Sequence, residues 1–329
     1  MLKIKTTDMS NRVKILITGG AGFIGSNIAK KLIDRGDKVV IIDNFNDYYD
    51  PQLKRDRIKI FLKGYKFKLY RGDIRDEKLV EKIFKTEKID KVIHLAAMAG
   101  VRNSLKDPKL YFDVNVMGSL NLLEAAVKYK IKNFVFASSS SVYGNNKKVP
   151  FSESDPVDTP ISPYAASKKT DELIAHVYHH IHGLNVTALR FFTVYGPWGR
   201  PDMSYFLFAN AITKGKPIKV FNRGKMSRNF TYIDDIATGT ITVLDKAKGY
   251  GVMNIGGDRE ETLMRYIEVL EENLGKCAKK KMLPIQPGDV PKTVADIRKL
   301  RKLGWKPTTR IEKGIKSFVE WYKEYYKKA

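Results

Sequence analysis

Cysteine is nearly absent from this chain, which has a single one, Cys277, among its 329 residues. One thiol cannot form an internal disulfide, so a secreted fold held together by disulfides is excluded. Long hydrophobic runs are also absent, because no stretch approaches the roughly 20 uncharged apolar residues of a transmembrane helix. Residues 1–12 mix charges with threonines and contain no apolar segment typical of a signal peptide. We therefore expect a cytoplasmic protein without a membrane partner.

Acidic residues are scarce relative to basic ones: 36 Asp and Glu against 60 Lys and Arg leave a net charge of +24. Such an excess favours anionic partners, including nucleic acid, anionic lipid or a phosphorylated small molecule. The lysines are dispersed along the chain, for example at Lys30, Lys31, Lys128 and Lys132. A nucleic-acid-binding surface would instead concentrate them on one face or arm. We therefore predict no nucleic-acid partner.

Apolar runs alternate with helical patterns through more than half of the chain. Strands are predicted over 13–18, 38–43, 67–73, 91–97, 133–138 and 185–192, and helices over 23–35, 77–88, 115–129 and 164–182. Strands that are apolar on both faces are typical of a parallel sheet covered by helices on both sides. The pattern predicts an α/β fold, a Rossmann-type doubly wound parallel sheet.

Beyond Gly196 the pattern loosens, because prolines and glycines interrupt it and the predicted elements become shorter. This change indicates a smaller C-terminal α/β lobe. We place the approximate boundary there, with a Rossmann-type domain over 1–196 and a smaller lobe over 197–329, and the chain is free to cross between them.

Three glycines, Gly19, Gly22 and Gly25, join the first predicted strand to the first predicted helix. Glycines at such a turn let the backbone approach a pyrophosphate at the positive end of the helix. Alone, the triplet also fits an ordinary strand–helix turn. Asp43 ends the next strand, where a carboxylate binds ribose hydroxyls and repels a 2′-phosphate, so we predict NAD as the cofactor. Asp73 follows the third strand as either an adenine contact or a helix cap.

A second motif, Tyr164-x-x-x-Lys168, opens a predicted helix, so its two side chains lie one turn apart on one face. An ammonium beside a phenol favours the phenolate, which allows the tyrosine to act as a general base. Upstream, a run of serines from 138 to 141 follows a predicted strand. Active sites form at the carboxyl ends of such strands, and a serine there is able to hydrogen-bond the reacting oxygen.

Taken together, these motifs resemble those of extended short-chain dehydrogenases/reductases, in the NAD-dependent nucleotide-sugar epimerase/dehydratase family. Four segments most resemble UDP-glucuronate 4-epimerases: 43–50, 100–104, 190–203 and 286–291. Such enzymes are isomerases that oxidise C4 of a UDP-sugar, let the 4-keto sugar rotate and return the hydride to its other face. The resemblance implies that Tyr164 is the base, that Lys168 binds the nicotinamide ribose and that Ser139 holds O4.

The resemblance also implies the remaining site residues. Thr193 and Arg200 are expected to hold the sugar carboxylate, Arg228 the diphosphate and Asp289 the uridine ribose. The further residues expected at the cofactor are Phe23, Ile24, Asn44, Asp73, Ile74 and Ala96. The further residues expected at the UDP-sugar are Arg102, Ser140, Ser141 and Gln286.

The uronic acid substrate imposes a chemical constraint, since its 4-keto intermediate is a β-keto acid that loses CO₂ when the carboxylate bond stands perpendicular to the carbonyl plane. An arginine is able to hold the carboxylate away from that alignment through two parallel hydrogen bonds. Related dehydratases and decarboxylases carry acids where Ser140 and Ser141 stand, which favours epimerisation. Two alternatives remain open, namely a neutral or N-acetylated UDP-hexose as substrate and, less favoured, UDP-glucuronate decarboxylation.

A UDP-glucuronate 4-epimerase would supply UDP-galacturonate for surface polysaccharide. The helices over 115–129 and 164–182 resemble those of a four-helix dimer interface, so a homodimer is expected. No metal site is expected, because no Glu or Cys completes one around the histidines at 176, 179, 180 and 182.

Overall fold

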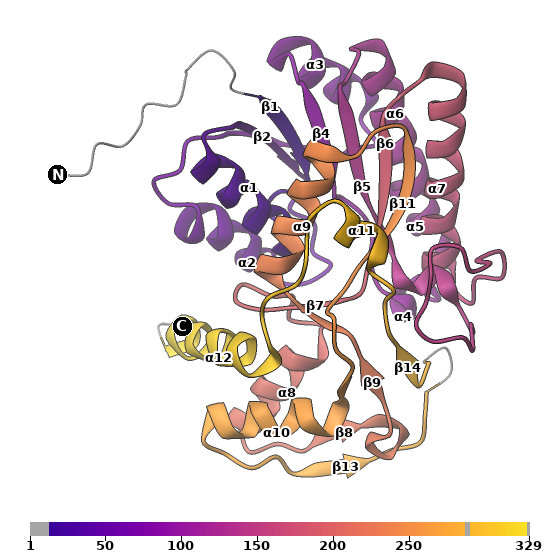
Figure 1. The fold of residues 1–329 in the computed structure, drawn as a ribbon. Helices are drawn as coiled ribbons and strands as arrows, with labels where there is room; N and C mark the ends of the chain where they lie inside the picture. Colours follow the sequence, from indigo (N-terminus) through magenta and orange to yellow (C-terminus); the bar gives the residue numbers. More distant parts are fainter. Residues whose placement is uncertain (1–12, 287–289, 328–329) are drawn as a thin grey trace.

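The computed structural model describes residues 13–286 and 290–327. Figure 1 shows a parallel sheet between two layers of helices, with a smaller part beyond one end of its strands. The seven strands lie in the order β11-β6-β5-β4-β1-β2-β3, and all their pairings are parallel. They are β1 (Lys14–Thr18), β2 (Lys38–Asp43), β3 (Lys68–Arg71), β4 (Lys91–His94), β5 (Asn133–Ser139), β6 (Val186–Phe191) and β11 (Tyr250–Ile255). The predicted doubly wound α/β fold is confirmed.

Helices cover both faces of this sheet because alternate strand residues point to opposite sides. On one face Ile15 and Ile17 share a core with α1 (Phe23–Arg35) and α9 (Ile233–Lys246). On the other face Leu16 shares a core with α3 (Glu77–Glu87), α6 (Gly118–Lys128) and α7 (Pro163–His182). The chain reverses its direction of winding between β1 and β4, and in such sheets a ligand binds in the crevice outside that switch point.

The connections that follow these strands are short elements. They are α2 (Pro51–Asp56), the π-helix η2 (Arg57–Phe61), α4 (Val101–Ser104), α5 (Pro108–Phe112), the π-helix η3 (Asp113–Met117) and the 3₁₀ turn η4 (Ser140–Tyr143). The strand predicted over 91–97 ends early at His94, because the backbone amides of Leu95 and Ala96 turn back to the Thr18 hydroxyl.

The smaller part is held together by an aromatic and aliphatic core between three helices, α8 (Ser204–Thr213), α10 (Leu263–Leu274) and α12 (Ile311–Lys327). Its short strands form three small sheets. They are β7 (Thr193–Tyr195) with β10 (Phe230–Tyr232), β8 (Ile218–Val220) with β13 (Lys280–Met282), and β9 (Ser227–Arg228) between β12 (Glu261–Thr262) and β14 (Lys292–Thr293). The turn η5 (Phe221–Gly224) and helix α11 (Arg298–Lys302) complete the described elements.

The domain boundary near residue 196 remains a prediction. Segments on both sides of it build the large sheet layer, since α9 packs on α1 and β11 pairs with β6. The chain thus crosses between the two parts after residue 197, as Figure 1 shows for the orange elements.

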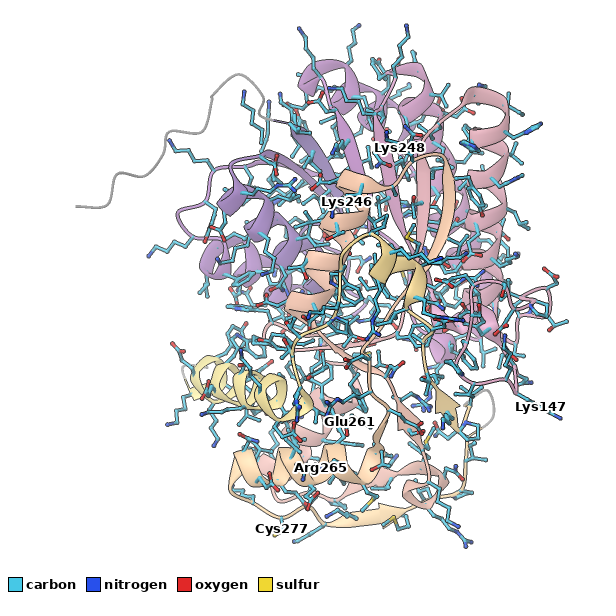
Figure 2. All side chains as sticks on the ribbon, viewed as in Figure 1. Lys147, Lys246, Lys248, Glu261, Arg265 and Cys277 are labelled. Carbon is cyan, nitrogen blue, oxygen red and sulfur yellow. The ribbon has the colours of Figure 1, made fainter. Side chains whose placement is uncertain are left out.

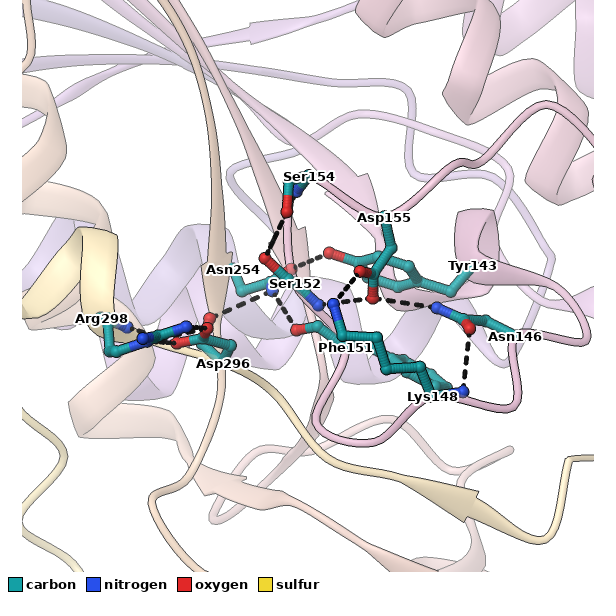
Figure 3. Close-up of polar contacts among 10 residues, drawn as sticks. All are labelled: Tyr143, Asn146, Lys148, Phe151, Ser152, Ser154, Asp155, Asn254, Asp296 and Arg298. Carbon is teal, nitrogen blue, oxygen red and sulfur yellow. Dashed lines mark hydrogen bonds and ion pairs between the residues drawn. The ribbon is translucent and has the colours of Figure 1, made fainter.

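A hydrogen-bonded junction fastens the loop that leads from β5 to α7 (Figure 3). Asn254 of β11 accepts a hydrogen bond from the Tyr143 hydroxyl (2.7 Å) and donates to the carbonyls of Phe151 (2.9 Å) and Asp296 (3.1 Å). Within the loop, Asp155 accepts hydrogen bonds from the Asn146 amide and the Ser152 backbone. These contacts therefore tie the end of the serine turn and the loop after it to β11 and to the segment around Asp296.

The molecular surface carries basic side chains from many separate elements. In Figure 2 Lys147 and Lys248 extend from different parts of the molecule, and Cys277 lies exposed on the smaller part. Within residues 13–286 and 290–327, no helix is long and apolar enough to cross a bilayer.

Candidate active site

A single cavity of about 1080 Å³ lies between the carboxyl ends of the sheet strands and the smaller part. Every predicted site residue that the structure describes lines it. On the cofactor side these are Gly19, Gly22, Phe23, Ile24, Gly25, Asp43, Asn44, Asp73, Ile74 and Ala96. On the substrate side they are Arg102, Ser139, Ser140, Ser141, Tyr164, Lys168, Thr193, Arg200, Arg228 and Gln286. Asp289 lies outside the described residues, and the individual roles remain predictions.

The glycine loop has a backbone geometry that only glycine fits. Gly19 adopts φ +68°, and the Gly22 amide donates to the Gly19 carbonyl at 2.9 Å. A Cβ placed on Gly25 would lie 2.4 Å from the same carbonyl oxygen. The loop therefore packs tightly against the start of α1, which leaves the helix N-terminus open to an anionic group.

Asp43 connects this loop to the end of β2. Its buried carboxylate accepts the Ala21 amide (3.0 Å) on one oxygen and the Phe45 amide (2.9 Å) on the other. Each oxygen retains acceptor capacity for a ribose hydroxyl. A negative charge at this position disfavours a 2′-phosphate, so the cradle fits NAD.

Asp73 is ionised beside this cradle. Burial alone would raise its pKa, but hydrogen bonds from Arg75 and from the Asn44 amide (2.9 Å) outweigh burial and lower the pKa to about 2. Asp73 also accepts the Arg75 backbone amide (3.0 Å), but the cap of the following helix α3 is Asp76, whose carboxylate accepts the Leu79 amide. The helix-cap alternative for Asp73 is therefore wrong, and its adenine contact remains a prediction.

Tyr164 lies in the first turn of α7, which begins with a well-formed cap. The Ser162 hydroxyl accepts the Ala165 amide at 3.1 Å, and Pro163 occupies the first helical position. One turn later Lys168 is buried, and its ammonium donates to Asp171 at 3.1 Å. Burial raises the pKa of Asp171 to about 6 in spite of this lysine, and its second oxygen has no partner.

The serines of the run from 138 to 141 make different contacts. Ser138 donates to Glu172 of α7 (2.6 Å), and the same carboxylate holds Arg190 of β6 through two hydrogen bonds of 2.8 Å. Ser139 ends β5, and its hydroxyl oxygen accepts the Ser141 amide at 3.1 Å. The buried Glu172 therefore fixes α7 against two strands, while the following serines face the cavity.

Sequence reasoning missed a buried polar chain beneath the cavity. The Thr18 oxygen accepts two backbone amides, so its proton goes to Nδ1 of His94 at 2.6 Å, and Nε2 then donates to Ser119 at 2.9 Å. Asn115 continues the chain by donating to the Ser167 hydroxyl of α7 at 2.9 Å. Burial lowers the pKa of His94 to about 3, which keeps the ring neutral. Only the strand order, which places Thr18 beside His94, would have revealed this contact.

Arg200 is held in a defined orientation on the substrate side. Its guanidinium donates to both oxygens of Asp202 (3.0 and 2.6 Å) and lies 5.4 Å from the centre of the Tyr48 ring. Its backbone amide donates to the Tyr205 hydroxyl at 3.1 Å. Thr193 lines the same cavity at the start of β7.

The remaining predicted substrate residues lie on the side of the smaller part. Arg228 donates to the carbonyls of Ser227 (2.8 Å) and Pro291 (3.0 Å), and Arg102 stacks over the Phe221 ring at 5.5 Å. The Gln286 side-chain oxygen is buried without a hydrogen-bond partner.

Lys54 is a further cavity residue that the motifs did not indicate. It is buried in α2, where its ammonium donates to the carbonyl (3.0 Å) and the side-chain oxygen (2.6 Å) of Asn46. Burial lowers the pKa of Lys54. Among the residues that the structure describes, no group of three or more His, Cys, Asp or Glu is arranged to hold a metal.

Comparison with known families agrees with this site. Residues 15–256 match the sequence model of the NAD dependent epimerase/dehydratase family. This chain belongs to that family. The resemblance inferred from the motifs is therefore confirmed at the level of the family.

Individual members of the family are similar over nearly the whole chain. A UDP-glucuronate 4-epimerase of Thermodesulfobacterium geofontis is 48% identical over 311 residues, which cover 94% of this chain and 96% of that one. UDP-glucuronate 4-epimerase 4 of Arabidopsis thaliana is 47% identical, covering 97% of this chain and 77% of its own. The crystal structure of UDP-glucuronic acid 4-epimerase from Bacillus cereus, in complex with UDP-glucuronic acid and NAD, superposes with a TM-score of 0.90. It is 37% identical, covering 95% of this chain and 100% of that one.

Proposed function

We propose that this protein is an NAD-dependent isomerase that converts UDP-glucuronate to UDP-galacturonate by epimerisation at C4. The observation that carries the proposal is one cavity that combines a dinucleotide cradle, the Ser139/Tyr164/Lys168 set and Arg200. Relatives at 47–48% identity are named UDP-glucuronate 4-epimerases, and the crystal structure that superposes with a TM-score of 0.90 holds both UDP-glucuronic acid and NAD.

The glycine loop and Asp43 would hold NAD, with Asn44 and Asp73 near the adenosine half. When bound, NAD supplies a hydride acceptor for C4 of the sugar and later returns the hydride. Phe23, Ile24, Ile74 and Ala96 line this half of the cavity and would exclude water from the cofactor. The cradle fits because a Cβ at any of the three glycines would lie within 3.0 Å of backbone atoms.

Tyr164 would take the proton of the O4 hydroxyl, and Ser139 would hold the same oxygen by a hydrogen bond. Lys168 lies one turn away, where it would bind the nicotinamide ribose and stabilise the phenolate. In the present structure the ammonium donates to Asp171, so forming the ribose contact would require only a change of acceptor within the same buried pocket.

Arg200 and Thr193 would hold the sugar carboxylate. Asp202 occupies the Nε and one terminal nitrogen of Arg200, which leaves the other terminal nitrogen for the substrate. Held in this way, the carboxylate of the β-keto intermediate stays out of the perpendicular alignment that expels CO₂. Ser140 and Ser141 place no acid in the serine turn, which disfavours the proton transfers of dehydratases and decarboxylases.

The smaller part would bind the nucleotide. Arg228 and Arg102 would contact the diphosphate, Gln286 would contact the UDP-sugar, and Asp289 would contact the uridine ribose. This division of labour supports a cofactor-binding domain over 1–196 and a substrate lobe over 197–329, with α9 and β11 packing into the former.

A homodimer is part of the proposal. Three exposed apolar side chains, Leu173, Val177 and Ile181, follow one another at four-residue spacing on α7, and Phe112 and Met117 add to the exposed apolar surface. Contiguous apolar surface of this kind marks an interaction site. We also propose a cytoplasmic location and a role in supplying surface polysaccharide precursors.

The test is a proton NMR time course of purified protein with UDP-glucuronate and no added NAD. We expect signals of UDP-galacturonate to grow, and Tyr164→Phe to lower kcat by about 10²–10⁴-fold as loss of a general base does. A UDP-pentose as the main product would instead identify a decarboxylase. No reaction even with added NAD, but turnover of UDP-glucose or its N-acetylated analogue, would transfer the proposal to a neutral UDP-hexose.

A further inference from the structure

Arg57 is a buried cation whose contacts all go to loops of the cavity. Its side chain is 0% exposed, yet within the described part of the chain no carboxylate lies at ion-pair distance. Instead, Nε and one terminal nitrogen donate to the Trp198 carbonyl (2.9 and 2.7 Å), and the latter also donates to the Gly199 carbonyl (3.1 Å). The other terminal nitrogen donates to the Tyr49 hydroxyl (2.7 Å) and the Ala21 carbonyl (3.3 Å).

These acceptors belong to three separate loops. Ala21 lies in the glycine loop, Tyr49 in the loop that follows Asp43, and Trp198 and Gly199 directly precede Arg200. A buried charge is costly unless its hydrogen bonds are satisfied. The fork of the guanidinium therefore holds these three loops in one arrangement, which a single-point ammonium is unable to reproduce.

The loop before Arg200 needs such support, because Trp198 adopts φ +62°, in the left-handed region that non-glycine residues rarely adopt. Its ring packs between Phe61 (5.6 Å between ring centres) on one side and Trp321 and Tyr325 of α12 (5.3 Å each) on the other. Hydrogen bonds to its carbonyl and tight aromatic packing thus fix the backbone immediately before the arginine.

We propose that Arg57 is a positioning residue for Arg200, and that it thereby sets the fidelity of the reaction on a uronic acid. The inference rests on the proposed function. Without Arg57 the carbonyls of Trp198 and Gly199 lose their donors, the turn relaxes and the Arg200 guanidinium no longer keeps one direction toward the substrate carboxylate.

A loosened carboxylate has a defined chemical consequence. In the 4-keto intermediate the C5–C6 bond breaks, its electron pair enters the enolate of the C4 ketone and CO₂ leaves. C5 then takes up a proton, and the hydride that was removed from C4 returns to C4 and reduces the ketone. The product is a UDP-pentose, so the ratio of UDP-pentose to UDP-galacturonate reports how firmly the carboxylate is held.

The experiment compares wild type with Arg57→Gln and Arg57→Lys. NMR gives the product ratio and kcat/KM, absorbance gives the NAD retained per chain after gel filtration, and thermal unfolding gives stability. We expect kcat/KM for UDP-glucuronate to fall about 10–100-fold, as for other small displacements of positioning groups. We also expect the UDP-pentose fraction to rise at least about threefold in both variants, because neither keeps the fork. The matched control is Arg55→Gln, an exposed arginine two residues earlier, which should leave all readouts unchanged.

The product ratio separates positioning from mere support of the fold, since it is measured only on molecules that turn over. NAD content should stay close to that of wild type, because the glycine loop keeps its bonds to Asp43 and to the Ile42 carbonyl. Folded Arg57→Lys with the wild-type product ratio and KM would overturn the inference, even if Arg57→Gln fails to fold. Wild type that makes no UDP-galacturonate would instead overturn the proposed function.

Discussion

Lys168 and Asp171 form a buried ion pair one and two helical turns after the proposed catalytic tyrosine. Lys168 is expected to bind the cofactor ribose. The Asp171 carboxylate, which now accepts the hydrogen bond of this lysine, therefore competes with the ribose for its ammonium group. Burial favours the neutral acid, which is why the pKa of Asp171 rises from 3.8 to about 6 although an ammonium lies 3.1 Å away.

This shift predicts a pH-dependent stability difference between wild type and Asp171→Asn. A carboxyl whose pKa is raised by folding contributes stability that is complete below pH 3.8 and lost as pH rises through about 6. The amide does not titrate, so the free energy of unfolding of the variant should gain on wild type by up to about 3 kcal/mol over that window. Denaturant unfolding at pH 4, 5, 6 and 7 measures the difference.

The matched control for this prediction is Asp158→Asn, because Asp158 is an exposed carboxylate that pairs only loosely with Lys169 at 3.8 Å. Its difference from wild type should vary little over the same pH range. If the difference in unfolding free energy between Asp171→Asn and wild type is equally independent of pH, burial of the Asp171 carboxyl does not govern its ionisation.

At the scale of elements, local pattern predicted most of the large sheet and little of the smaller part. The strand over 38–43 and the helix over 23–35 agree with β2 and α1 residue for residue, because each carries its own apolar periodicity. β9, β12 and β14 have two residues each, too few for any period, and exist through their mutual pairing.

The same limit applies to the site. The glycine loop and the Tyr-x-x-x-Lys motif are local patterns, and their residues line the same cavity. The partners of Arg57 lie 8 to 142 positions away in the sequence. Those of His94 lie 25 and 76 positions away, and those of Asn254 lie 42 to 111 positions away. Spacing within the sequence gives no sign of such contacts, because they depend on which strands and loops become neighbours.

The junction between β11 and the loop after β5 yields a prediction at this scale. Asn254→Ala would leave the Tyr143 hydroxyl and the Asp296 carbonyl without this partner in a buried place, and the Phe151 carbonyl would keep only the Asp296 amide as donor (Figure 3). Unsatisfied buried groups cost about 1–3 kcal/mol each, so we expect a loss of roughly 3 kcal/mol or more. For a chain of 329 residues that loss corresponds to a thermal midpoint lower by about 4–5 °C.

Asn145→Ala is the comparison for this variant, since Asn145 is exposed in the same loop. Calorimetry of both proteins under identical conditions measures the shift. Equal midpoints for the two variants would show that the junction does not hold the loop.

At the scale of the whole molecule, the exposed apolar side chains of α7 would be covered only in the proposed homodimer. Leu173, Val177 and Ile181 are 56%, 48% and 65% exposed and form one stripe along the helix. Placing two carboxylates there, as Val177→Glu/Ile181→Glu, would oppose burial of the stripe in an interface, because each charge would be buried without a partner.

We therefore expect light scattering to give twice the chain mass of 37.5 kDa for wild type and the single mass for the double variant at micromolar concentration. Ile60→Glu provides the control, because Ile60 is a comparably exposed residue (56%) on η2, away from α7, and should leave the dimer intact. A monomeric wild type would contradict the proposed dimer directly. A double variant that stays dimeric would place the interface on another face. The stripe lies on the outer side of α7, and the first turn of the same helix carries Tyr164. Circular dichroism and NAD retention therefore report, independently of the mass, whether α7 is still intact in the double variant.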